Sequence, residues 1–171
     1  MNWRLLSAWG TDERPTRLWP WLGHTGSLTE KLRGAVGAAF HVEVLRECTA
    51  PLTVEDALLL HQLPGTAANM REVYLCGTRP CVYARTLVAA DAQHWLRNLN
   101  AQPLGDRVFA APGTERLPIQ GARLASGCEL YAAAVKRLAH PPAELWARRS
   151  VLVAGSVRIL IYECFLGLDF P

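Results

Sequence analysis

Three charged residues interrupt strand-like apolar runs, and they are the residues of this sequence best suited to chemistry. Glu163 lies in ILIYECFLGL, residues 159–168, while Arg71 and Arg85 lie in MREVYLCGTRPCVYARTLVA, residues 70–89. Because side chains alternate between the two faces of a strand, each charge shares a face with apolar neighbours. Such a charge requires an opposite charge or a ligand, unless that face of the sheet is open to water.

The C-terminal hairpin offers a partner for Glu163. Its sequence, RRSVLVAGSVRILIYECFLG, centres on Gly155-Ser156, which suits a two-residue turn with glycine in the first position. In that register Arg148 lies opposite Glu163, whereas a three-residue loop would place Arg149 there. The sequence therefore predicts a guanidinium beside this carboxylate in either register.

The loop of the first hairpin decides whether the two strand arginines cooperate. An even loop pairs Arg85 with Glu72 and leaves Arg71 on the other face, whereas an odd loop brings Arg71 and Arg85 to one face. The residues between the strands, Gly77-Thr78-Arg79-Pro80, do not settle this parity.

Composition limits the chemistry that is available. The five cysteines and five histidines are dispersed without a metal-ligand spacing, and no Gly-rich phosphate loop or GxSxG motif is present. Only Lys31 and Lys136 among the 18 basic residues are lysines, and the arginines are scattered, so we expect no nucleic-acid partner. Carboxylates, guanidiniums and backbone groups are expected to carry the function, without a metal.

We expect an α+β protein with one domain spanning residues 1–171, cytoplasmic and not embedded in a membrane. Ser27 and Glu30 form a capping-box pattern before a first helix. Segment 47–66 is expected to be irregular, with one helical turn after Thr53, and long enough to serve as a lid. The expected antiparallel strands span about 40–46, 70–76, 81–89, 148–154 and 157–166, and the expected helices about 28–38, 91–99 and part of CELYAAAVKRLAH, residues 128–140.

Several of these segments resemble the chorismate lyase family. They are SLT before the first helix, REVYLCGTRPCVYARTLV, PLG at 103–105 followed by Phe109, and LWARRSVLVAGSVRILIYECFL, and together the resemblance extends over about residues 20–166. The resemblance implies an antiparallel sheet with helical flaps. It also implies a carbon–oxygen lyase that converts chorismate to 4-hydroxybenzoate and pyruvate, the committed step towards the ubiquinone ring in bacteria.

The resemblance also implies roles for particular residues. Arg71 matches the arginine that binds the ring carboxylate, and Glu163 the glutamate that meets the hydroxyl end and is a candidate proton relay. Leu104 matches a position whose backbone contacts ligand, and Leu28 a flap position. Arg85 matches a further pocket arginine, expected to steady the enolpyruvyl carboxylate, and this favours the odd hairpin loop.

The implied reaction forms an aromatic ring, so it needs orientation and charge placement but no cofactor. The helix at 28–38 and segment 47–66 are the expected covers of the site, and we expect a monomer. The chain departs from the family pattern at Ala84 and Ala147, where glycine is more usual, and at Leu28, which replaces methionine. Two alternatives stay open: a non-catalytic metabolite sensor of the same architecture, and a lyase or isomerase for a related cyclic enol ether.

Overall fold

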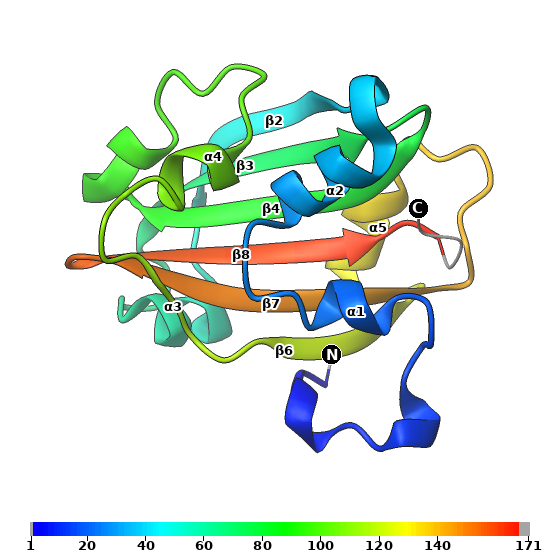
Figure 1. Ribbon diagram of the computed structural model, residues 1–171. Helices are drawn as coiled ribbons and strands as arrows, with labels where there is room; N and C mark the ends of the chain where they lie inside the picture. Colours follow the sequence, from blue (N-terminus) through cyan, green and yellow to red (C-terminus); the bar gives the residue numbers. More distant parts are fainter. Residues whose placement is uncertain (1, 168–171) are drawn as a thin grey trace.

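The chain folds into one antiparallel sheet with helices on both faces (Figure 1). The structure, a computed structural model, describes residues 2–167. Within that range eight strands pair in the order β1-β6-β7-β8-β4-β3-β2, and β5 pairs with β7. The strands are β1 (Arg4–Leu5), β2 (His41–Pro51), β3 (Ala67–Cys76), β4 (Pro80–Ala89), β5 (Glu115–Arg116), β6 (Gln120–Ala125), β7 (Glu144–Ala154) and β8 (Val157–Phe165).

The two faces of the sheet are covered by different helices. The front face, which carries Glu163, lies under α1 (Trp19–Leu22), α2 (Leu28–Val36) and α4 (Leu104–Val108) (Figure 1). The back face, which carries Tyr162, packs against α3 (Val54–Leu60) and α5 (Glu129–Val135). Short 3₁₀ turns span Leu6–Ala8, Thr11–Glu13, Gly37–Ala39 and Ala90–Trp95.

The first predicted helix is confirmed, with its cap. Ser27 adopts extended backbone, and its hydroxyl accepts a hydrogen bond from the Glu30 amide at 3.2 Å. The α-helix ends at Val36, two residues earlier than predicted. Gly37 has a φ of 59°, a left-handed conformation that favours glycine and starts the 3₁₀ turn.

Segment 47–66 differs from the prediction of an irregular lid. β2 continues to Pro51, and α3 follows with Thr53 as its N-cap. This helix packs on the back face, where the Tyr162 hydroxyl hydrogen-bonds Asp56. The segment therefore does not cover the front face, because its apolar side chains Ala57 and Leu60 join the back-face core.

The two hairpins have different outcomes. In the second, Ala154 pairs with Val157 and Arg148 with Glu163, so the predicted register is confirmed. In the first, Glu72 pairs with Arg85, so the odd register favoured by the resemblance is wrong. The loop at 77–79 is itself odd, but Cys81 is an extra residue in β4, and this bulge restores the even pairing.

The segment between β4 and β7 holds more structure than its sequence indicated. The predicted helix at 91–99 is a 3₁₀ turn over Ala90–Trp95, and the helix predicted within 128–140 is α5. Strands β5 and β6 were not predicted, and β7 begins at Glu144 rather than 148. No helix within residues 2–167 is long and apolar enough to cross a membrane.

The cap of α3 generates a test of the back-face packing. The Thr53 hydroxyl accepts from the Asp56 amide at 3.1 Å and donates to its carboxylate at 2.7 Å. We expect Thr53→Ala to lower the free energy of unfolding by about 1 kcal/mol, measured by urea denaturation. Thr78→Ala, in the exposed hairpin loop, is the control. Equal stability of the two variants would contradict a capping role.

Candidate active site

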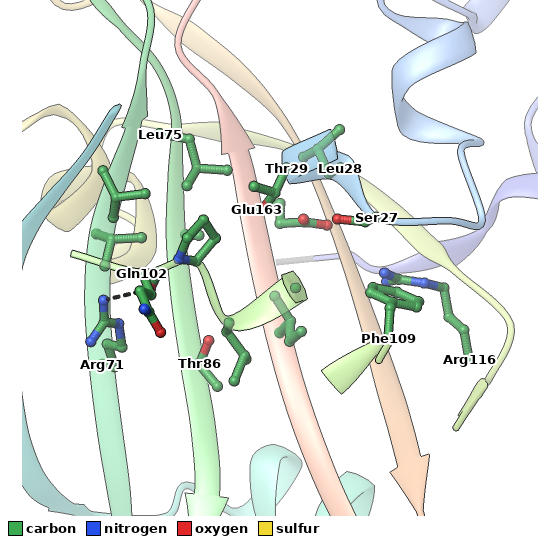
Figure 2. A pocket seen from close by; sticks show the side chains of 17 residues that line it. Ser27, Leu28, Thr29, Arg71, Leu75, Thr86, Gln102, Phe109, Arg116 and Glu163 are labelled. Atoms are coloured by element: carbon green, nitrogen blue, oxygen red, sulfur yellow. Dashed lines mark hydrogen bonds between the residues drawn. The ribbon is translucent and has the colours of Figure 1, made fainter. Parts of the chain in front are cut away.

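A pocket lies on the front face between the centre of the sheet and the starts of α2 and α4 (Figure 2). Its floor comes from β3, β4 and β8, and its cover from residues 27–29, residues 102–105 and Phe109. The structure brings together four of the five predicted site residues at this pocket, namely Arg71, Glu163, Leu28 and Leu104. Arg85 is the exception.

Arg71 is held at one end of the pocket with 3% of its surface exposed. Its Nη1 pairs with the Glu47 carboxylate, and its Nη2 donates to the backbone carbonyls of Asn100 at 2.5 Å and Gln102 at 3.2 Å. Burial lowers the pKa of the Arg71 guanidinium, and Glu47 opposes that shift. These contacts fix the planar fork, which suits a bidentate contact with a carboxylate.

Glu163, 6% exposed, forms an ion pair with Arg148, which is fully buried. Arg148 Nε donates to Glu163 Oε2 at 2.5 Å. Its Nη1 donates to three carbonyls of the N-terminal segment, those of Trp21, Leu22 and His24, at 2.9, 3.2 and 2.6 Å. Arg148 therefore ties the segment that leads into α2 to the carboxylate on β8. Within residues 2–167 no hydrogen bond occupies Glu163 Oε1, which leaves it for a ligand.

Arg116 is a pocket residue that the sequence did not indicate. It lies at the end of the two-residue strand β5, where no apolar periodicity marks it. Its Nε donates to the Thr25 carbonyl at 3.0 Å, its Nη1 donates to the Ser150 hydroxyl, and its guanidinium lies 5.2 Å from the Phe109 ring centre. Burial lowers the pKa of Arg116 to about 10, and the Glu163 charge opposes that shift.

Arg85 does not reach the pocket, which corrects its predicted place beside Arg71. Because Cys81 is bulged, the Arg85 side chain points to the back face. There its Nε donates to Glu72 at 2.9 Å, and its two terminal nitrogens bind Glu129 of α5 at 2.8 and 2.7 Å. Arg85 belongs to β4, which forms part of the pocket floor, but its side chain lies on the opposite face of the sheet.

The two covers of the pocket contact each other. A Cβ atom at Gly105 would stand 2.8 Å from the Ser27 hydroxyl, so only glycine permits this approach of α4 to α2. Arg33 of α2 and Asp106 of α4 form an exposed ion pair at 2.9 Å. Leu28, 2% exposed, lines the pocket next to Ser27. Ligand entry therefore requires these covers to move.

Solved structures with the same arrangement of sheet and helices establish the fold. The chain is similar to PhnF from Mycobacterium smegmatis, with a TM-score of 0.65 and 13% identity over 87% of this chain and 67% of that one. The effector domain of PhnF alone gives a TM-score of 0.60 and 15% identity over 84% and 90% of the two chains. At this identity the likeness concerns the fold and carries no function.

Sequence comparison defines the family. The chorismate lyase family model matches residues 10–169. A probable chorismate pyruvate-lyase from Azoarcus sp. (strain BH72) is 39% identical over 91% of this chain and 86% of its own length. One from Nitrosomonas europaea is 34% identical over 89% and 88%. The chain belongs to the chorismate lyase family.

The buried pair at the pocket generates a stability prediction. Arg148→Met leaves Glu163 buried without its counter-charge, so we expect the free energy of unfolding to fall by about 3–5 kcal/mol. Adding Glu163→Gln to that variant should recover part of the loss, because the uncompensated charge is then absent. Denaturant unfolding of the two single variants and the double variant measures this coupling. Strictly additive losses would show that the pair is not coupled.

Proposed function

We propose that this protein is a chorismate pyruvate-lyase, which eliminates pyruvate from chorismate to give 4-hydroxybenzoate for ubiquinone synthesis. One observation carries the proposal: a buried guanidinium, Arg71, and a buried carboxylate, Glu163, face the same covered pocket. Arg71 lies opposite Thr86, Thr86 opposite Ile161, and Glu163 is two residues beyond Ile161. The Cα atoms of Arg71 and Glu163 are thus about 12 Å apart, and the proposed ring lies between their side chains.

Each end of the substrate has a partner in this arrangement. The Arg71 fork donates hydrogen bonds to the ring carboxylate, and Glu163 Oε1 accepts a hydrogen bond from the ring hydroxyl. Leu28 and Leu104 close over the ring from α2 and α4, and the backbone at Leu104 contacts it. The relatives are described as probable chorismate pyruvate-lyases, and together with this set of residues they support chorismate as the substrate.

The reaction requires no group beyond the substrate and the protein. The ether bond between the ring and the enolpyruvyl oxygen breaks, and a proton leaves the ring carbon that bears the hydroxyl. The ring becomes aromatic, while the departing enolpyruvate takes the electron pair and gains a proton at its methylene carbon to become pyruvate. The protein orients the reactant and excludes water.

We also propose that the enzyme acts as a cytoplasmic monomer. One chain supplies every residue named around the pocket, so a second copy is not needed to complete it. The substrate and both products are water-soluble anions, which suits an aqueous compartment.

The decisive experiment is incubation of the purified protein with chorismate alone. We expect 4-hydroxybenzoate and pyruvate to form in equal amounts, measured by chromatography and by a coupled lactate dehydrogenase assay. Binding of 4-hydroxybenzoate without turnover would instead indicate a non-catalytic sensor. Neither products nor binding would point to a different cyclic enol ether.

A separate variant decides whether Glu163 transfers a proton. Glu163→Gln keeps the size of the side chain and one hydrogen-bond acceptor but removes the base. If Glu163 is the proton relay, kcat should fall by about 100-fold or more. A near-normal kcat would show instead that the proton moves within the substrate. The binding constant for 4-hydroxybenzoate controls for loss of the pocket.

A further inference from the structure

We propose that Arg116 is the second substrate-binding cation of the pocket, and that it receives the enolpyruvyl carboxylate. This inference rests on the proposed function, because chorismate has two carboxylates and its aromatic product has one. Arg85 was expected to bind the second carboxylate, but it lies on the back face with carboxylates of its own. Arg116 is the pocket guanidinium that this leaves in addition to Arg71.

Arg116 lies at the correct end of the pocket. In chorismate the enolpyruvyl ether is attached to the ring carbon next to the one that bears the hydroxyl, far from the ring carboxylate. Its carboxylate therefore lies near the partner of the hydroxyl, Glu163, and away from Arg71. Arg71 is on β3, Glu163 on β8, and Arg116 on β5, which pairs with β7 beyond β8. Figure 2 shows Arg71 and Arg116 on opposite sides of Glu163.

The partners of Arg116 are all uncharged within residues 2–167. They are the carbonyls of Thr25 and Gly26 and the hydroxyl of Ser150. No carboxylate lies within ion-pair distance of it in that range, whereas Arg71 has Glu47. Burial lowers the pKa of Arg116 to about 10, and the charge of Glu163 opposes that shift without an ion-pair contact. An incoming carboxylate would supply a direct ion pair.

Glu163 acts on Arg116 only through its charge at a longer distance, whereas it makes a direct hydrogen bond with Arg148. This end of the pocket therefore contains two positively charged guanidiniums, those of Arg148 and Arg116, and one negatively charged carboxylate, that of Glu163. Arg148 Nη2 is also buried without a hydrogen-bond partner among the described residues. The excess of one positive charge matches the one negative charge that the enolpyruvyl group brings.

Arg116 also links this carboxylate to the first flap. Thr25 and Gly26, whose carbonyls it binds, immediately precede Ser27, the cap of α2. A carboxylate that orders the Arg116 fork therefore also orders the start of the flap that carries Leu28. After pyruvate leaves, 4-hydroxybenzoate lacks this contact, so Arg116 distinguishes the substrate from the aromatic product.

The test compares Arg116→Gln with Arg71→Gln, which makes the same chemical change at the other end of the pocket. We expect Arg116→Gln to lower kcat/KM for chorismate by about 100-fold while the Kd of 4-hydroxybenzoate changes by less than about threefold. Arg71→Gln should weaken both. Equal losses of turnover and product binding in Arg116→Gln, or unchanged turnover, would overturn the inference.

A second measurement is needed in case Arg116→Gln folds poorly. Arg116→Lys keeps the positive charge, and the melting temperature of each variant shows whether it is folded. Wild type should bind 4-hydroxybenzoate bearing a carboxymethyl ether next to its hydroxyl more tightly than the corresponding methyl ether, and Arg116→Lys should reduce that preference. The same preference in both proteins would also overturn the inference. Wild type that neither converts chorismate nor binds 4-hydroxybenzoate would instead refute the proposed function itself.

Discussion

The pocket depends on the buried pair of Arg148 and Glu163. A carboxylate among the apolar side chains of β8 needs a counter-charge, and the Arg148 guanidinium bonds both that carboxylate and the carbonyls of Trp21, Leu22 and His24. The pair thereby joins β7, β8 and the segment that leads into α2. Because such pairs compensate a desolvation penalty rather than add much stability, we interpret this one as a means of placing the carboxylate.

Sequence patterns predicted the parts of the site that depend on regular pairing. Alternation placed Glu163 on a face, and the two-residue turn at Gly155 fixed Arg148 opposite it. Alternation alone did not predict the face of Arg85. The single bulged residue Cys81 shifts the register so that Arg85 points to the back face, and no local sequence pattern indicates this bulge. Arg116 was missed for a related reason, since it follows a loop and its position depends on long-range contacts.

The same sheet serves proteins of different function. The effector domain of PhnF shares the fold at 15% identity, whereas the lyase relatives share 31–39% identity over most of the chain. The fold alone therefore does not assign a function, and the side chains on the front face must be considered separately. In this chain an arginine and a glutamate lie two strands apart on a covered face and line the same pocket.

The contact between Gly105 and Ser27 joins the two flaps as well as closing each over the sheet. Together with the ion pair of Arg33 and Asp106, this contact connects α2 and α4 directly. Each cover is therefore held by the other as well as by the sheet. The ion pair is exposed and added salt screens such a pair, so ionic strength weakens one of the two contacts between the covers.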